Sequence, residues 1–128
     1  MRRTTRRAAG WLALALLLAA GCQRLDFENT YPLEGFDAQE IGFSPPQYEQ
    51  KVTVTVTTSP AVPVSAYLVK TSDLDALKKN PASVQALGKQ EKSDNIKFDA
   101  TVPAKTDYTV YLIGTGKKTE AKVKVVGR

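Results

Sequence analysis

The side chains that most enzymes use for proton transfer and metal binding are scarce in this sequence of 128 residues. It contains no histidine and one cysteine, Cys22. No imidazole is therefore available as a general base, and no cysteine–histidine set can hold zinc. A disulfide within one chain is also excluded, because it needs two cysteines.

Serine–lysine pairs remain as candidates for nucleophilic catalysis. Ser72 lies close to Lys70, and Ser93 follows Lys92. Such a pair works only where the lysine is desolvated and acts as a base. Ser72 is better explained as the cap of a short helix, and Ser93 as part of an exposed loop, so neither pair predicts an enzyme.

Carboxylates offer two further sites, and both are weak. Asp73 and Asp75 would point to different faces of a helix, where acids in the first turn are ordinary partners of the helix dipole. Asp94, Asn95 and Asp99 offer oxygen ligands for calcium, but the spaced aspartates and glycine of a calcium loop are missing. We therefore expect a protein that is not an enzyme, with no metal and no cofactor.

Lysines form the main candidate for binding. From Lys51 onward there are 13 basic residues against 7 acidic ones. Four lysines occupy polar positions of predicted strands, namely Lys51, Lys97, Lys122 and Lys124, and Lys117 and Lys118 lie nearby in a turn. If these strands are neighbours, their polar face could bind an anionic glycan, lipid headgroups or an acidic protein surface. Two alternatives remain open: the lysines only keep the sheet soluble and protect its edges, or the acidic segment before residue 49 folds back on them.

The high isoelectric point, about 9.4, does not indicate nucleic-acid binding. Arg2, Arg3, Arg6 and Arg7 supply four of the 18 basic residues, and none of the 13 acidic residues precedes Asp26. The excess charge therefore belongs mostly to the first residues of the chain.

Alternating apolar residues predict the strands that carry these lysines. Residues 51–57 alternate valine with lysine or threonine, and residues 62–68 and 96–102 show the same two-residue period. Residues 108–113 are apolar on both faces, which predicts a central strand. The sequence Gly114-Thr115-Gly116-Lys117 would then turn the chain into residues 121–125 as a hairpin.

Between residues 70 and 96 the period changes, which predicts one or two short helices. Ser72 is the expected cap of the first, with Leu74 and Leu77 on its buried side. Asn80 and Pro81 are typical of the start of a second, which would bury Val84 and Leu87 and end at Gly88. Residues 89–95 are polar and predict an exposed loop.

The first 22 residues have the three parts of an export signal. A segment over 2–7 with four arginines is followed by an apolar run over 11–20, which as a helix spans only about half of a bilayer core. The segment Leu18-Ala19-Ala20-Gly21-Cys22 resembles the lipobox of bacterial lipoproteins, although leucine is commoner at the position of Ala19. The resemblance implies cleavage after residue 21 and acylation of Cys22. Gln23, rather than aspartate, favours the outer membrane. An ordinary signal peptide and a twin-arginine signal are the alternatives.

Residues 22–48 predict an acidic tether between the acylated cysteine and a folded domain over 49–128. Proline and glycine interrupt this segment, yet it is rich in aromatic residues, which a disordered linker lacks. Its second half is expected to dock on the domain, with a first strand near Ala38–Phe43. The alternative is that its aromatic residues bind a partner.

Together these patterns predict a mainly β fold: a small antiparallel β-sandwich, jelly-roll or immunoglobulin-like, with one or two short helices. The segments Val62–Val69, Ser72–Leu74 and Val102–Leu112 resemble bacterial pre-peptidase C-terminal domains, small β-sandwiches appended to secreted proteins. Lys105 is a departure, because that family often has glycine near this position. The resemblance implies an accessory module with no catalytic residue.

The expected function is that of an exported, lipid-anchored protein of the bacterial cell envelope. Its β-sandwich would act as an accessory subunit or scaffold of an envelope assembly, with a protein partner. The alternative is a standalone module that binds an anionic glycan or another envelope polymer through Lys51, Lys97, Lys122 and Lys124.

Overall fold

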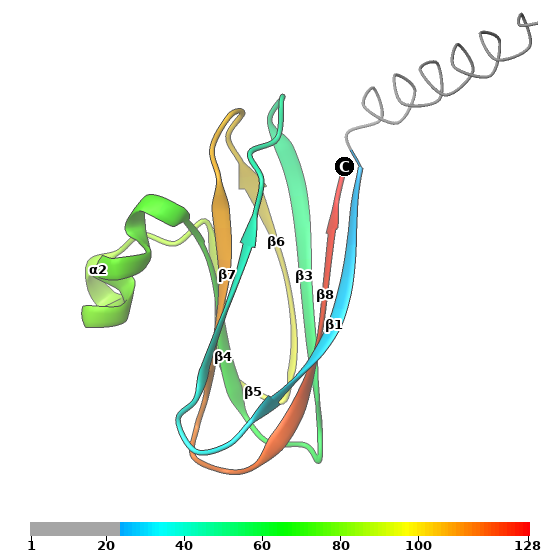
Figure 1. Cartoon of the computed structure of the whole chain (residues 1–128), viewed down its shortest axis with the longest axis vertical. Coiled ribbons are helices and arrows are strands. Elements are labelled where there is room, and N and C mark those ends of the chain that lie inside the picture. Colours follow the sequence, from blue (N-terminus) through cyan, green and yellow to red (C-terminus); the bar gives the residue numbers. More distant parts are fainter. Residues whose placement is uncertain (1–23) are drawn as a thin grey trace, which may run out of the picture.

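The computed structural model describes residues 24–128, which form two antiparallel sheets packed face to face (Figure 1). Cys22 and the export signal predicted over residues 1–21 lie outside the described residues. The strands are β1 Leu25–Leu33, β2 Ala38–Phe43, β3 Gln50–Ser59, β4 Val64–Lys70, β5 Gly88–Ser93, β6 Asn95–Val102, β7 Tyr108–Gly114 and β8 Thr119–Gly127. One sheet, here called sheet A, has the order β1-β8-β3-β6, and the other, sheet B, has the order β2-β7-β4-β5. This architecture confirms the predicted small β-sandwich.

The core between the sheets is built from the alternating residues that the sequence singles out. Val52, Val54 and Val56 of β3 are fully buried, and each intervening residue points outward from sheet A. The other sheet supplies Val110 and Leu112 from β7, a central strand between β2 and β4. Inward-facing residues of both sheets thus form one apolar layer.

A short helical segment covers part of the outer face of sheet B. It consists of the 3-10 helix η1 (Thr71–Asp73), the helix α2 (Leu74–Lys79) and the 3-10 helix η2 (Pro81–Ser83). Leu74 and Leu77 pack on Tyr67, Val69 and Tyr111 of the sheet. Helix α2 lies at the side of the sandwich in Figure 1. Both leucines are buried, as predicted. None of the helices within residues 24–128 has the length and apolar character needed to cross a bilayer.

The helix caps differ in part from the prediction. Asp73, not Ser72, precedes α2, and its side chain makes no cap hydrogen bond. The predicted cap at Asn80 is confirmed, since its Oδ1 accepts a hydrogen bond from the backbone N–H of Ala82 at 3.2 Å. Val84 and Leu87 are half-buried, beyond the end of the helical segment.

Residues 25–48 are more ordered than a tether. The segment 25–33 is strand β1, which pairs with β8 from Leu25 opposite Gly127 to Leu33 opposite Thr119. The strand expected near Ala38–Phe43 is present as β2 and pairs with β7. The sandwich therefore includes residues on both sides of the boundary expected at residue 49.

The predicted hairpin between residues 108–113 and 121–125 is wrong. Strand β7 pairs with β2 and β4, whereas β8 pairs with β1 and β3. The turn after Gly114 therefore crosses from sheet B to sheet A. Strands β7 and β8 each have two neighbours already. One neighbour of each comes from the N-terminal residues, namely β2 beside β7 and β1 beside β8.

The polar segment predicted as a loop over residues 89–95 is mostly strand β5, Gly88–Ser93. It forms the edge of sheet B beside β4. An edge strand with solvent on one side needs few apolar residues, so its sequence carries no two-residue period. The first residue of this strand, Gly88, packs closely against Phe98. An added Cβ would lie 2.7 Å from the Phe98 ring, so a larger residue does not fit there.

Candidate functional site

The four predicted lysines all lie on the outer face of sheet A. Their strands β3, β6 and β8 are direct neighbours. Thr55 of β3 stands opposite Lys97 of β6 on one side and opposite Lys124 of β8 on the other. Side chains at directly opposed positions share one face of a sheet, so these three form a row across the strands.

A second pair of basic residues lies further along the same sheet, where β3 begins and β8 ends. The backbone N–H of Lys51 donates to the carbonyl oxygen of Arg128 at 3.2 Å, and the N–H of Arg128 donates to the carbonyl oxygen of Lys51 at 3.0 Å. This pairing brings the two exposed cations side by side. Arg128 continues the outward alternation of residues 122 and 124, so the strand period contained a signal for it that the sequence analysis did not use.

These cations surround a shallow depression of about 470 Å³. The residues that line it are Lys51, Thr53, Thr55, Lys97, Asp99, Lys124, Val126 and Arg128, and this set is called the basic face below. Asp99 is its single acidic residue, and its carboxylate accepts a hydrogen bond from the Thr53 hydroxyl at 2.7 Å. The basic face therefore combines four cations with two threonine hydroxyls.

Lys122 lies on the same sheet but outside the depression. Its Nζ is 2.9 Å from a carboxylate oxygen of Glu28 in β1. The hydrogen bond and charge of Lys122 lower the pKa of Glu28, and the charge of Lys124 lowers it further. The acidic segment before residue 49 thus does fold back on the lysines, but on the described contacts it pairs with Lys122 and leaves the basic face open.

The residues weighed for catalysis are not brought together. Ser72 lies exposed in η1, and Ser93 ends β5, where its hydroxyl donates to the carbonyl oxygen of Asn95 at 3.0 Å. Within residues 24–128 no three aspartate, glutamate, histidine or cysteine side chains form a cluster that could hold a metal ion. Asp94 and Asp99 do not share a site, because Asp99 belongs to the basic face and bonds Thr53.

No family model matches the sequence, and neither does any curated protein. Solved structures do match in fold. A periplasmic lysozyme inhibitor of g-type lysozyme from Aeromonas hydrophila is 12% identical, with a TM-score of 0.54 over 83% of this chain and 87% of that one. The Yersinia pseudotuberculosis-derived mitogen is 5% identical, with a TM-score of 0.57 over 79% of this chain and 84% of that one.

The pre-peptidase C-terminal domain of a Bacillus anthracis collagenase is a third similar structure. It is 11% identical, with a TM-score of 0.57 over 79% of this chain and 89% of that domain. The resemblance noted from the sequence is therefore supported at the level of the fold. Identities this low show a shared β-sandwich fold and say nothing about activity.

Proposed function

We propose that this chain is a non-catalytic, lipid-anchored accessory protein of the bacterial cell envelope, and that its basic face holds an anionic envelope glycan. The observation that carries this proposal is the basic face itself, an open sheet surface with four cations and one acid. The placement of helix α2 supports it, because within residues 24–128 the helix packs on the outer face of sheet B and not on that of sheet A.

The spacing of the cations suits a polymer better than a small anion. Lys97 and Lys124 are separated by one intervening strand, about 10 Å at the usual strand spacing. Lys51 lies four residues from Thr55 along β3, about 13 Å. One small anion cannot contact cations this far apart, whereas a chain with repeated negative charges can contact several at once.

The role of a subunit held by apolar contacts is the second candidate. The large apolar side chains that stand exposed in residues 24–128 are Phe36, 77% exposed, and Tyr48, 66% exposed. Phe36 lies in the turn between β1 and β2, and Tyr48 lies between β2 and β3, at the opposite end of the sandwich (Figure 1). A stable interface buries a larger apolar patch than two separate side chains provide. The geometry therefore favours binding through the basic face over a subunit role held by apolar contacts.

Alginate, a polymer of uronic acids, provides a direct test, with neutral dextran as its control. The full-length protein in detergent should bind alginate, and the affinity should fall as salt is raised. Replacing Lys51, Lys97 and Lys124 by glutamine should weaken binding about tenfold, at roughly 0.5 kcal/mol for each exposed charge. Calorimetric titration measures the dissociation constant.

The matched control replaces Lys70, Lys79 and Lys89 by glutamine, which removes the same charge from residues outside the basic face. This variant should bind alginate within about twofold of the wild type. An equal loss in both variants would show that net charge alone drives binding. A stoichiometric protein recovered after crosslinking of intact envelopes, with no alginate binding, would favour the subunit role.

The lipid anchor has its own prediction. If Cys22 is acylated, Cys22→Ala should leave an uncleaved precursor or release the protein from the membrane fraction, since acyl chains hold such proteins at the bilayer. Membrane fractionation and mass spectrometry of the mature N-terminus measure this. Unchanged membrane retention of the alanine variant, without acyl mass on the wild type, would rule out the anchor.

A further inference from the structure

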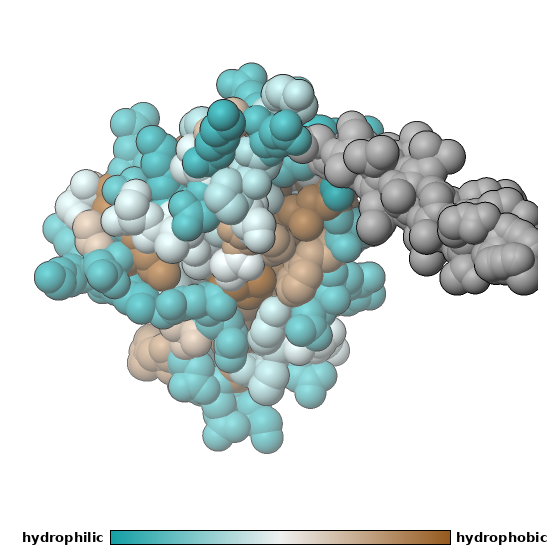
Figure 2. Space-filling view, turned by 45° about the horizontal axis from the view of Figure 1, so that its top comes forward, coloured by the Kyte–Doolittle hydropathy of each residue, from teal (hydrophilic) through white to brown (hydrophobic). Residues whose placement is uncertain are grey.

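A second site lies at the end of the sandwich where β1 begins and β8 ends (Figures 1 and 2). A cavity of about 800 Å³ opens there between the sheets. Figure 2, which brings this end forward, shows apolar surface recessed among hydrophilic side chains. Its lining consists of Leu25, Gly42, Phe43, Ser44, Pro45, Pro46, Gln47, Gln50, Lys105 and Tyr108. Cavities of this size commonly take small molecules.

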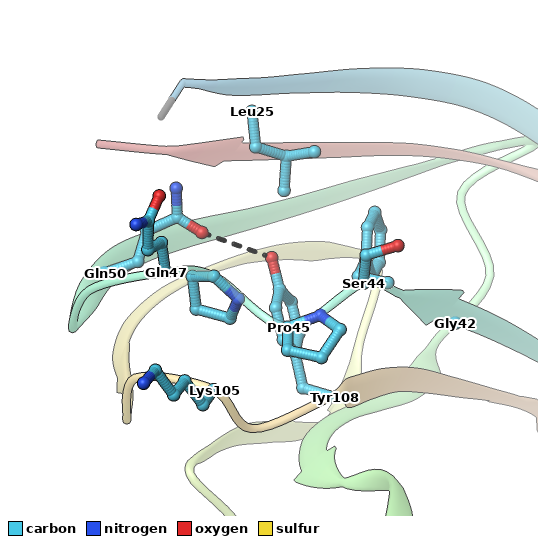
Figure 3. Close-up of a pocket in the computed structure, with 10 residues that line it drawn as sticks. Leu25, Gly42, Ser44, Pro45, Gln47, Gln50, Lys105 and Tyr108 are labelled. Carbon is cyan, nitrogen blue, oxygen red and sulfur yellow. Dashed lines mark hydrogen bonds between the residues drawn. The ribbon is translucent and has the colours of Figure 1, made fainter. Parts of the chain in front are cut away.

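One wall of the cavity is apolar and is fixed in place before any ligand arrives. The ring of Phe43 stacks on the ring of Tyr108, with centroids 5.1 Å apart. It also packs edge-on against the ring of Phe27, with centroids 5.4 Å apart. Leu25 reaches in from sheet A, opposite Tyr108 of sheet B (Figure 3). A flat apolar face of a ligand could lie on this wall without rearrangement.

The floor is polar and is formed by Tyr108 and Gln50, which are 1% and 6% exposed. The Tyr108 hydroxyl donates to Oε1 of Gln50 at 3.5 Å, a long hydrogen bond (Figure 3). Burial raises the pKa of Tyr108 to about 12, so the hydroxyl keeps its proton further into the alkaline range than an exposed tyrosine does. A buried hydroxyl with so long a bond retains capacity for a shorter one to a ligand.

The rim is polar, with one cation. Ser44, Gln47 and Lys105 are exposed around the mouth, and none of the ten lining residues is acidic. The backbone N–H of Lys105 donates to the carbonyl oxygen of Pro46 at 2.7 Å, which joins the turn after β6 to the loop after β2. The mouth is therefore held by both sheets and favours negative charge.

We propose that this cavity binds a single sugar ring, with preference for an acidic one such as a uronic acid. A sugar ring offers a C–H face to the wall of Phe43 and Leu25, hydroxyls to Tyr108 and Gln50, and a carboxylate to Lys105. A hydrocarbon chain fits worse, because it offers no hydroxyl with which Tyr108 or Gln50 could form a further hydrogen bond. This site does not depend on the basic face.

The experiment is a calorimetric titration of the full-length protein with glucuronate, glucose and octanoate. We expect glucuronate to bind best, glucose more weakly, and octanoate not to bind. Tyr108→Phe keeps the ring and removes the hydroxyl, so both sugars should lose about fivefold to tenfold in affinity. Lys105→Gly should remove the preference for glucuronate over glucose.

The Lys105→Gly variant is also expected to fold, so a change in its sugar affinity would not result from misfolding. Lys105 has φ = +58°, a backbone conformation that glycine adopts at little cost, so this variant should unfold at or above the wild-type temperature. Lys97→Gln on the basic face is the matched control and should leave sugar affinity unchanged. Binding of octanoate in place of sugars, the absence of any sugar binding, or wild-type affinity in both Tyr108→Phe and Lys105→Gly would overturn the proposal. None of these outcomes depends on alginate binding by Lys51, Lys97 and Lys124.

Discussion

Two tyrosine hydroxyls are removed from water on opposite faces of sheet B. Tyr108 points into the sandwich, and Tyr67 lies beneath helix α2, where its hydroxyl donates to the carboxylate of Glu91. Burial raises the pKa of both residues to about 12, and for Tyr67 the hydrogen bond and charge of Glu91 add to the effect. Both faces of the sheet therefore favour the protonated phenol.

The pH dependence of stability follows from these shifts. An unfolded tyrosine loses its proton near pH 10.0, whereas Tyr67 and Tyr108 hold theirs until about pH 12 when folded. Their contribution to stability is complete below pH 10 and is lost as the pH rises through 12. Denaturant unfolding at a series of alkaline pH values should show this loss. Tyr67→Phe and Tyr108→Phe should each lose stability less steeply, and an unchanged slope in both would contradict the assignment.

Lys105 carries a charged side chain at a position whose backbone conformation suits glycine. The resemblance to pre-peptidase C-terminal domains places glycine near this position, and the structure gives Lys105 a positive φ of 58°. A side chain in this region costs roughly 1–2 kcal/mol. The turn thus keeps a backbone conformation suited to glycine while it places a cation at the cavity mouth.

At the scale of elements, the strands predicted from the sequence are those with a sustained apolar pattern on one face or on both. The alternation in residues 51–57 and 96–102 predicted β3 and β6, and the two apolar faces of residues 108–113 predicted a central β7. Strand β1 also alternates, because Leu25, Phe27, Tyr31 and Leu33 face the core while the residues between them are exposed, so it carried a two-residue period that the sequence analysis did not use. Strand partners also depend on distant residues, which is why the hairpin was mispredicted.

The same distinction applies to the candidate sites. Lys51, Lys97 and Lys124 were predictable as outward residues, but only the strand order shows that they share one depression. The ion pair of Lys122 with Glu28 depends on the pairing of β1 with β8, which the local sequence does not show. The end cavity was not predictable, because the loop after β2, the turn after β6 and the start of β1 meet there only in the folded chain.

Leu33 tests whether β1 belongs to the folded core. It is fully buried at the end of β1, although the sequence placed it in a tether. Leu33→Ala should lower the free energy of unfolding by about 2–5 kcal/mol, because it removes buried apolar groups and leaves a cavity. Thr30→Ala, at an exposed position of the same strand, should change it by only about 0.5 kcal/mol. Equal unfolding temperatures for the two variants would show that β1 is not part of the core.

At the scale of the whole molecule, the two sheets have different outer surfaces. Sheet B is partly covered by α2, and Lys78 of that helix forms an ion pair with Glu40 of β2. Sheet A leaves its basic face open, and the cavity opens at the end shared by both sheets. Gln50 enters the cavity, while the next residue, Lys51, belongs to the basic face. The two proposed sites therefore adjoin at the start of β3, and one glycan chain could occupy both.

The pairing of the first described strand with the last one has a consequence for chain order. Leu25 stands opposite Gly127, so the start of β1 and the end of β8 lie side by side (Figure 1). A circular permutant can therefore join Arg128 to Arg24 through a short glycine-rich linker and open the chain between the exposed Lys117 and Lys118. We expect it to fold to the same sandwich, with a similar circular dichroism spectrum and cooperative thermal unfolding. Its β8 and β1 would then be consecutive strands of a hairpin, and the new chain ends would lie at the far end from the cavity.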